Sequence, residues 1–429
     1  MGAQISGDFE AMAYDAIGQT GTPVTSVAAR SLKILHVGKF MPPSFGGMER
    51  ALASMARGVA DRGHNVRVLV HTGDGRTGAG TDQQHGMTIC REPYRFAVGT
   101  MPISMGYLET YRRWSRWADI VHFHEPFPTA SVAFSLLPKP HRIVVSWHSD
   151  IVRQRLLRPL AEIFQKRLCA RADRIICSTG RLRDSSTVLA PWRHKCAVVG
   201  FGLDASALRE AAANQTQIEA TRQRCGGRFV LAVGRLVSYK GFDVLLRALS
   251  GNDLRVVIVG DGPLAGELEQ LRADLGLQDR VLFVGGLDDT ELATYYAACE
   301  FFVLPSTTRA ETFGIVQIEA MACGKAVINT ALPTGVPEVS LDEITGLTVP
   351  PGDVAALRAA LVALWRNPVL TAELGARASE RVDARYEQNA AARELEALYR
   401  SVMRADLSAV RLPSSSANAV PISDKATIV

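Results

Sequence analysis

Short apolar runs alternate with helix-length amphipathic segments along most of the chain. Runs that are nearly continuous in Val, Ile and Leu are typical of parallel strands covered on both faces. A first series lies at residues 33–37, 66–71, 119–124, 142–148, 174–178 and 196–199. A second series lies at residues 229–233, 255–259, 281–284, 301–304, 326–329 and 347–349. The pattern therefore predicts an α/β protein with two parallel-sheet domains in tandem.

The length of 429 residues also favours two domains, because it exceeds what one core usually supports. We place the first domain at residues 31–205 and the second at residues 206–385. Residues 201–228, polar and rich in alanine, are predicted to connect the two with some helix. Residues 1–30 and 405–429 are predicted to be disordered extensions.

The composition is that of a globular protein, with 47% hydrophobic and 21% charged residues. No apolar run approaches the roughly 18 residues that cross a bilayer, and the first thirty residues do not resemble a secretory signal. The seven cysteines contain no C-x-x-C pair, which indicates reduced thiols and not a disulfide framework or a zinc site. We therefore expect a cytoplasmic protein.

Charge is distributed unevenly between the two halves. Residues 31–200 hold 25 Lys and Arg against 12 Asp and Glu, whereas residues 201–429 hold 22 against 28. A basic half suits an anionic lipid surface, a polyanion or a phosphate-bearing substrate. Its basic amphipathic segment at 151–174, and the basic and aromatic one at 107–117, fit either a helix packed on the sheet or a membrane contact.

The stretch at residues 305–325 carries the most informative chemistry. It has the pattern of a strand end, a loop and a helix, with Glu311 in the loop, a turn at Gly314 and Glu319 in the helix. Amides at a helix start bind anions such as phosphate, and carboxylates accept hydrogen bonds from hydroxyls. Phosphate and hydroxyls together describe a nucleotide-sugar. The spacing alone fits two solvated glutamates equally well.

Three other loops follow predicted strands, where ligands collect in open parallel sheets. Gly46 and Gly47 precede a helix and let backbone approach a ligand, although such a pair is more often a tight turn. His148 ends a strand and fits either a site or a structural role. Arg235 and Lys240 in a glycine-flanked loop would bind a diphosphate, with solvated loop charges as the alternative.

The segment at residues 259–265 formally matches the dinucleotide fingerprint G-x-G-x-x-G/A. It lies in the middle of the chain, and the expected acidic residue after the next strand is not convincingly placed. A turn that starts a helix, with Pro263 near its first position, explains it adequately.

Five motifs occur in a characteristic order along the chain. They are G-G-x-E-R at 46–50, H-S-D at 148–150, G-R-L-x-x-x-K-G at 234–241, V-G-D-G-P at 259–263 and E-T-F-G-I-x-x-x-E at 311–319. In this combination the chain resembles the retaining glycosyltransferases of family 4 over roughly residues 31–404. The resemblance implies the GT-B fold, with two Rossmann-like domains facing a central cleft and a helix at 386–404 crossing back onto the first domain.

The resemblance also implies a role for each matching residue. Arg235 and Lys240 would bind the donor diphosphate, and Glu311 would bind a hydroxyl of the donor sugar. Glu319 would bind the ribose hydroxyls, and His148 would lie beside the donor sugar. The predicted catalytic residues are His148, Glu311, Arg235 and Lys240. The predicted donor-binding residues are Gly46, Gly47, Asp150, Gly234, Phe313, Gly314, Ile315 and Glu319.

The sequence thus predicts a retaining hexosyltransferase that uses a UDP- or GDP-sugar and a hydroxyl of a glycan or lipid-linked saccharide. No D-x-D occurs in the chain, so we expect no metal and no other cofactor. The basic front half suggests an anionic lipid carrier at the inner face of the plasma membrane, in bacterial polysaccharide or glycolipid biosynthesis; no nucleic acid partner is expected. A sugar-nucleotide epimerase of the same fold is the alternative enzyme. A non-enzymatic interaction module explains the phosphate-binding motifs less well.

Overall fold

The front half of the chain folds around an eight-stranded sheet with the order β10-β9-β8-β7-β1-β2-β4-β3. All neighbouring strands are parallel except the β3–β4 pair. A separate antiparallel hairpin pairs β5 with β6. The strands are β1 (Lys33–Val37), β2 (Asn65–His71), β3 (Gly80–Gln84), β4 (Met87–Glu92), β5 (Phe96–Val98), β6 (Met101–Ile103), β7 (Ile120–Glu125), β8 (Arg142–Trp147), β9 (Arg174–Cys177) and β10 (Cys196–Val198).

The rear half folds around a six-stranded sheet with the order β13-β12-β11-β14-β15-β16, in which every pair is parallel. Parallel neighbours need long crossovers, so helices separate the strands and cover both faces. The strands are β11 (Val230–Val233), β12 (Val256–Val259), β13 (Val281–Gly285), β14 (Phe302–Val303), β15 (Val327–Thr330) and β16 (Gly346–Val349).

The computed structural model describes residues 30–42, 46–73, 79–98, 101–137, 140–151 and 158–404. The predicted disordered extensions therefore lie outside the described residues, apart from Arg30. By their contacts, the described residues from Leu32 to Arg404 belong to one compact unit.

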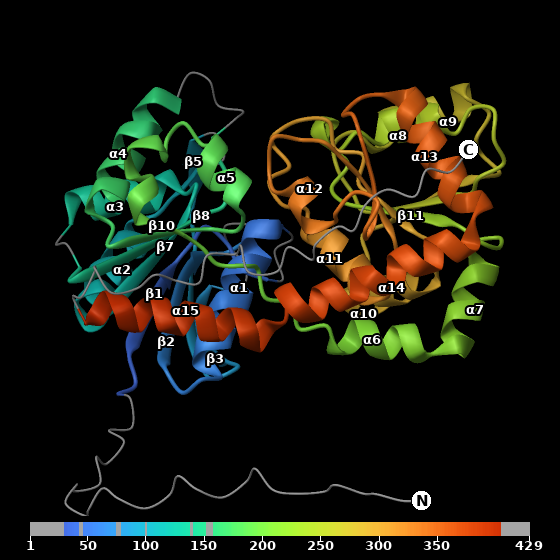
Figure 1. Ribbon diagram of the computed structural model, residues 1–429. Helices are drawn as coiled ribbons and strands as arrows, with labels where there is room; N and C mark the ends of the chain where they lie inside the picture. Colours follow the sequence, from blue (N-terminus) through green and yellow to red (C-terminus); the bar gives the residue numbers. More distant parts are fainter. Residues whose placement is uncertain are drawn as a thin grey trace, which may run out of the picture. The chain divides into compact units, whose positions relative to one another are not determined.

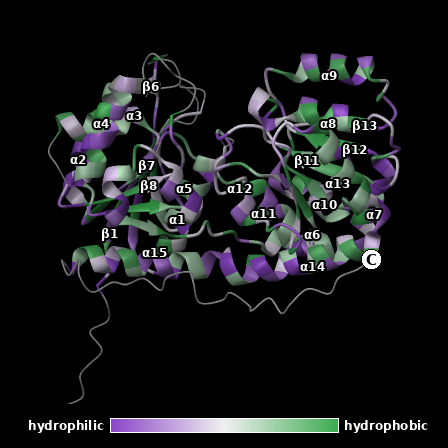
Figure 2. Ribbon diagram, turned by 45° about the horizontal axis from the view of Figure 1, so that its top comes forward, coloured by the Kyte–Doolittle hydropathy of each residue, from purple (hydrophilic) through white to green (hydrophobic). Residues whose placement is uncertain are grey.

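Helices flank the front sheet and join it to the rear one (Figure 1). Hydrophobic and hydrophilic residues alternate along these helices, as the colours of Figure 2 show, which is the pattern of helices that bury one face. In the front half they are α1 (Gly47–Ala60), α2 (Met105–Trp117), α3 (Pro128–Leu136), α4 (Arg158–Arg171), α5 (Gly180–Ser185) and the short 3-10 helix η1 (Ala190–Lys195).

The rear half contains its own set of covering helices. Several begin at a side-chain cap; for example, Asp353 accepts hydrogen bonds from two backbone amides at the start of α13. The set comprises α6 (Ser206–Ala213), α7 (Gln215–Arg224), the 3-10 helix η2 (Ser238–Lys240), α8 (Phe242–Ala248), α9 (Ala265–Asp274), α10 (Asp289–Ala298), α11 (Ile315–Ala322), α12 (Val336–Val339), α13 (Val354–Arg366) and α14 (Pro368–Arg385).

The last helix, α15 (Gln388–Met403), returns to the front half. Figure 1 shows it in red along the front sheet, and Leu395, Leu398, Tyr399 and Val402 join the core cluster that contains Ile34. Burial of these four side chains against the front strands stabilises the return by several kcal/mol, at roughly 1.5–3 kcal/mol for each large apolar residue. The predicted fold class, with a final helix crossing back, is confirmed.

The predicted strands all exist, with bounds within two residues of those observed. The sequence prediction missed β3, β4, β5 and β6. β3 is exposed on nearly every residue, and β5 is exposed on all three, so these segments lack the continuous apolar pattern of the central strands. They belong to the edge of the sheet and to the separate hairpin, where burial imposes little on the sequence.

Candidate active site

The loop between β14 and α11 carries Glu311 and ends at Gly314. This glycine caps α11 with a φ of 72°, in the left-handed region, and a Cβ on it would lie 2.6 Å from Leu304 Cδ2. Glycine tolerates both the conformation and the close approach. It therefore fixes the turn after which the first backbone amides of α11 lack partners within the helix.

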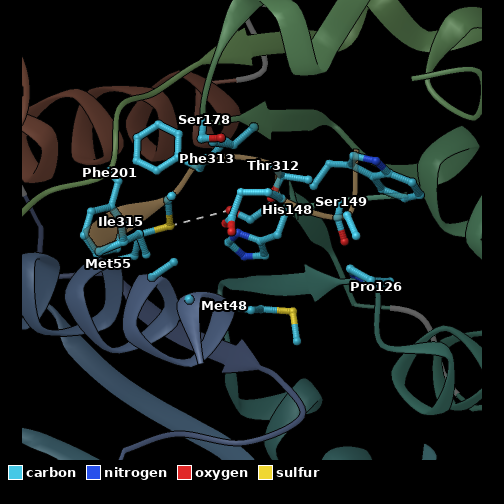
Figure 3. A pocket seen from close by; sticks show the side chains of 18 of the residues that line it. Met48, Met55, Pro126, His148, Ser149, Ser178, Phe201, Thr312, Phe313 and Ile315 are labelled. Atoms are coloured by element: carbon cyan, nitrogen blue, oxygen red, sulfur yellow. Dashed lines mark hydrogen bonds between the residues drawn. The ribbon is translucent and has the colours of Figure 1, made fainter. Parts of the chain in front are cut away.

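A pocket brings this turn together with the front sheet (Figure 3). The front half lines it with the start of α1 and with His148 and Ser149, which follow β8. The rear half lines it with Tyr239 and residues 310–315. Of the predicted site residues, the described structure places six on its wall: Gly47, His148, Glu311, Phe313, Gly314 and Ile315.

Lys240 forms a buried ion pair with Glu311, with 2.6 Å between Nζ and Oε2. The Ser306 hydroxyl donates to the same oxygen at 3.1 Å. Burial lowers the pKa of Lys240, but the charge and the hydrogen bond of Glu311, together with Tyr239 and Glu319, outweigh burial and the pKa is raised. Gly234 makes room for the lysine, because a Cβ there would lie 3.2 Å from Lys240 Cε. The structure thus joins the Lys240 loop to the Glu311 loop.

Arg235 is exposed at the end of β11, and it acts on Lys39 of the front half. The pKa of Lys39 is lowered, mainly by burial and further by the charge of Arg235, while Glu49 opposes the shift. Arg235 and Lys39 thus bring positive charge from both halves of the chain into one region, although neither is among the described residues that line the pocket. Lys39 follows β1 in the loop that leads to Gly46 and Gly47, and the sequence prediction did not single it out.

Glu319 is buried inside α11, where it is already paired. Tyr296 donates its hydroxyl proton to Oε2 at 2.7 Å, and the Arg50 guanidinium of α1 contacts Oε1. Arg50 also reaches Oδ1 of Asp289 at 2.5 Å. The Glu319 carboxylate is the main cause of the raised pKa of Arg50. Tyr296 was missed because a tyrosine inside a helix gives no signal beyond a core position.

His148 and Asp150 have different surroundings although they are two residues apart. The ring of His148 is on the pocket wall, and its burial lowers the pKa to about 4, so the ring is neutral near pH 7. Asp150 is not among the described residues that line the pocket. Its Oδ1 accepts hydrogen bonds from Trp147 Nε1 at 3.0 Å and from the Ser186 hydroxyl at 2.7 Å.

Three glycines of the predicted loops pack closely but are not among the described residues that line the pocket. A Cβ on Gly46 would lie 2.0 Å from Glu49 Oε2. In the segment that resembles a dinucleotide fingerprint, a Cβ on Gly260 would lie 2.2 Å from the Gly234 carbonyl oxygen, and one on Gly262 would lie 2.4 Å from that of Leu236. The glycines of this segment therefore let it pack against the loop of Arg235 and Lys240.

The aromatic side chains of the segment at 107–117 are not a surface patch. Tyr107, Tyr111 and Trp114 of α2 are buried in the front core, which corrects the prediction that left them available for a membrane. Their spacing of four and then three residues puts them on one face of the helix, and their burial shows that this face packs into the core. In α4, Leu168 and Cys169 are buried and the basic residues Lys166, Arg167 and Arg171 are exposed, as expected for a packed helix.

Comparison with known sequences covers both halves of the chain. The family described as "Glycosyltransferase Family 4" matches residues 45–206, and "Glycosyl transferases group 1" matches residues 214–381. The chain is 32% identical to D-rhamnosyltransferase WbpZ of Pseudomonas aeruginosa over 83% of this chain and 92% of that protein. It is 31% identical to O-antigen chain mannosyltransferase C of Escherichia coli, over 78% of this chain and 89% of that protein.

Comparison with solved structures identifies the same fold in known proteins. Sucrose-phosphate synthase from Thermosynechococcus elongatus superposes with a TM-score of 0.72 at 21% identity, over 87% of this chain and all of that one. Anabaena HepE, solved in complex with UDP-glucose, superposes with a TM-score of 0.70 at 21% identity, over 86% of this chain and 100% of that one.

Two parallel-sheet domains and these similarities define a glycosyltransferase of the GT-B fold. Within that class, the chain belongs to glycosyltransferase family 4. In the part of the chain that the structure describes, no helix has both the length and the apolar character needed to cross a membrane.

Proposed function

We propose that this protein transfers a hexosyl group from a nucleotide diphosphate sugar to a hydroxyl of a glycan or lipid-linked saccharide, with retention at the anomeric carbon. The names of the two sequence relatives support a rhamnosyl, mannosyl or similar hexosyl group and a role in the biosynthesis of a surface polysaccharide. The complex of HepE with UDP-glucose supports a nucleotide-sugar as the donor.

The contact between Lys240 and Glu311 beside the Gly314 turn is the observation that carries the proposal. A donor diphosphate offers Lys240 a second anionic partner, next to the free amides of α11. When Lys240 turns to the phosphate, Glu311 becomes available to a hydroxyl of the sugar. One movement of the Lys240 ammonium group would thus provide a contact for the diphosphate and free the Glu311 carboxylate for the sugar.

In the reaction, the bond between the anomeric carbon and the diphosphate oxygen breaks, and the acceptor oxygen attacks from the same face. The acceptor proton passes to the leaving phosphate oxygen. Lys240, Arg235 and the amides of α11 stabilise the charge that develops on the diphosphate. This is the task that a divalent cation performs in other transferases, and the chain has no D-x-D motif to hold one. We therefore propose that the reaction needs no metal or other cofactor.

Glu319 is the proposed partner of the ribose hydroxyls. Its carboxylate receives Arg50 and Tyr296 in the structure. A ribose that binds here must displace Arg50, which retains Asp289 as its other partner. The proposed nucleotide site is therefore occupied by a side chain of the front half until the donor arrives.

The acceptor and the location are proposed from charge. The excess of Lys and Arg in residues 31–200 favours an anionic acceptor such as a polyprenyl diphosphate-linked saccharide. Exposed Lys166, Arg167 and Arg171 on α4 supply part of this charge. Such an acceptor would place the protein at the inner face of the plasma membrane, bound peripherally from the cytoplasm.

The test uses the full-length protein with UDP, GDP and ADP in a thermal unfolding assay, because a bound ligand raises the melting temperature by mass action. The sugar nucleotide of the stabilising base is then incubated with a lipid-linked saccharide, with and without EDTA. We expect a glycosylated product whose new linkage has the anomeric configuration of the donor by NMR, and equal rates in EDTA.

Lys240→Met should abolish both stabilisation and transfer, whereas Lys325→Met should change neither, because Lys325 lies at the opposite end of α11 from Gly314. An epimer formed from the donor without acceptor would replace the proposal with the epimerase reading. An inverted linkage would refute retention alone.

A further inference from the structure

The front sheet contains a cluster of buried histidines behind the pocket. His36 lies on β1, and His122 and His124 lie on the neighbouring strand β7. The three side chains are fully buried, and Tyr399 of α15 reaches the same place. The proposed reaction assigns no role to any of these four residues.

Hydrogen bonds join the cluster into one chain that ends at the pocket. Ser146 Oγ lies 2.8 Å from His122 Nε2, and His122 Nδ1 lies 2.6 Å from the Tyr399 hydroxyl. That hydroxyl lies 3.4 Å from His36 Nε2.

The second part of the chain runs from β1 to the pocket wall. His36 Nδ1 lies 3.0 Å from His124 Nε2, and His124 Nδ1 lies 3.0 Å from His148 Nε2. Because Nε2 of His148 is engaged, Nδ1 is the ring nitrogen that remains for a ligand in the pocket.

Each imidazole in the chain carries one proton at neutral pH. Burial lowers the pKa of His36 to about 3 and that of His148 to about 4. Burial, together with neighbouring histidines, holds the pKa of His122 and of His124 well below the usual value. In a neutral ring one nitrogen donates and the other accepts, so the direction of one hydrogen bond fixes the direction of the next.

The contact of Ser146 with Met55 sets this direction. The Ser146 hydroxyl lies 3.5 Å from Met55 Sδ, marked by the dashed line in Figure 3, and a thioether can only accept. The Ser146 oxygen then accepts from Nε2–H of His122, and Nδ1 of His122 accepts from the Tyr399 hydroxyl.

The remaining directions follow one by one. The Tyr399 oxygen, having given its single proton to His122, accepts from Nε2–H of His36. Nδ1 of His36 accepts from Nε2–H of His124. Nδ1 of His124 accepts from Nε2–H of His148, which leaves Nδ1 of His148 without a proton.

We propose that His36, His122, His124 and Tyr399 are positioning residues that hold His148 as the Nε2–H tautomer, with Nδ1 as a hydrogen-bond acceptor for a substrate hydroxyl. The substrate part of this inference rests on the proposed function, whereas the tautomer is a property of the protein alone. Tyr399 belongs to α15, the helix that crosses back onto the front half. It acts on the pocket only through His36 and His124, which connect it by hydrogen bonds to His148.

A metal centre is the competing interpretation of the same residues. Nitrogen atoms of His36, His122 and His124 lie within 4.8 Å of one another. In a tetrahedral zinc site with bonds of 2.0–2.1 Å, ligand nitrogens lie about 3.3 Å apart. The rings would have to move together and give up the hydrogen bonds that each of them makes here, so we favour the hydrogen-bonded chain.

The first test reads the tautomer by long-range proton–nitrogen NMR on full-length protein labelled with 15N-histidine, near pH 7.5 and without ligand. The His148 signal is assigned by its loss in His148→Gln. We expect a bare Nδ1 and a protonated Nε2 in a single form. A protonated Nδ1 or a mixture in the wild type overturns the proposal. Stoichiometric metal in the purified protein by elemental analysis also overturns it.

The second test compares Tyr399→Phe with Tyr111→Phe. Loss of the Tyr399 hydroxyl removes the proton donor of His122 and the acceptor of His36. The hydrogen bonds from His36 through His124 to His148 can then run in either direction, so His148 can adopt either tautomer. Tyr111 is also buried in the front core, and among the described residues its hydroxyl has no hydrogen-bond partner. We expect a mixture of His148 tautomers only in Tyr399→Phe, with kcat/KM about tenfold lower. Tyr111→Phe should keep both the tautomer and the activity.

The outcomes separate this inference from the proposed function. If Tyr399→Phe keeps a single His148 tautomer, the inference is wrong whatever reaction the enzyme catalyses. If the tautomers mix and glycosyl transfer stays at the wild-type rate, the proposed contact with a substrate hydroxyl is wrong. If the tautomers respond as expected and the wild type transfers no sugar, the proposed function fails while the positioning of His148 stands.

Discussion

The ammonium nitrogen of Lys240 lies 2.6 Å from Oε2 of Glu311, and both side chains are buried. The two residues come from loops that follow different strands of the rear sheet, β11 and β14, which are neighbours in space. In the absence of a donor, each neutralises the other. The same ion pair therefore contributes to the free energy of unfolding and has to be rearranged when a donor binds.

The ion pair should show strong coupling in a double-mutant cycle. Lys240→Met and Glu311→Gln each leave a buried partner without its counterpart, and loss of one member of such a pair costs about 3–5 kcal/mol. The double variant should be destabilised by clearly less than the sum, as measured by urea unfolding. Additive effects would mean that the two side chains do not depend on each other in solution.

Glu311→Gln should lower the turnover of the proposed transfer by about 100- to 1,000-fold, on the scale of one lost oriented contact at roughly 2.7–4 kcal/mol. The reason is that an amide cannot accept from the sugar hydroxyl as strongly as a carboxylate. Steady-state kinetics with the natural donor measure the effect, and melting temperature checks the fold. Turnover within a factor of two of the wild type would remove Glu311 from the donor site.

Arg50→Met should strengthen the binding of the nucleoside diphosphate. Arg50 contacts Glu319 in the structure, so a ribose has to displace it at the cost of a charged hydrogen bond, about 1.5–3 kcal/mol before Asp289 compensates. Calorimetric titration should give a dissociation constant several-fold lower than that of the wild type. The matched control is Arg57→Met on the same helix, where the arginine pairs with Asp61 and Asp204. Weaker binding in Arg50→Met would mean that the arginine holds the nucleotide.

Gly241→Ala should destabilise the protein far more than Gly276→Ala. Both glycines have positive φ, 69° and 64°, so an alanine costs about 1–2 kcal/mol of backbone strain at either position. A Cβ on Gly241 would in addition lie 2.1 Å from the carbonyl oxygen of Pro305, whereas Gly276 has nothing within 4 Å. Equal free energies of unfolding for the two variants would show that the loop with Lys240 shifts freely.

Acid should weaken the fold through buried neutral histidines. His71 is buried against Tyr107, and burial lowers its pKa to about 4, below the value of about 6.5 in the unfolded chain. The unfolded state thus binds the proton more tightly, so this contribution to stability is full above pH 6.5 and is lost as the pH falls toward 4. Each such histidine adds up to about 1.4 kcal/mol per pH unit to the slope.

His71→Phe keeps an aromatic ring beside Tyr107 but cannot bind a proton. Between pH 6 and pH 4.5 the free energy of unfolding should therefore change less steeply with pH, by up to the contribution of one proton. Urea unfolding at a series of pH values measures it. A slope equal to that of the wild type would show that His71 titrates normally in the folded protein.

Much of the fold was predictable because burial on both faces leaves a long apolar imprint on the sequence. The six strands of the rear sheet and the central strands of the front sheet follow this pattern, as Val256–Val259 illustrates with four buried aliphatic residues. Edge strands such as Gly80–Gln84 lack this continuous apolar run, because most of their residues are exposed to water. The aromatic residues of α2 were ambiguous for a related reason: their helical spacing fits a core face and a surface patch equally.

For the candidate site, the sequence alone determined which motifs are present and that each follows a strand, because strand ends and glycine turns depend on local backbone chemistry. Only the tertiary structure decided which side chains meet. Lys240 joins Glu311 over 71 positions, Arg50 reaches Glu319 over 269, and Tyr399 contacts His122 over 277. Local pattern cannot encode such pairs, because the relative placement of two strands or helices results from packing summed over the whole core.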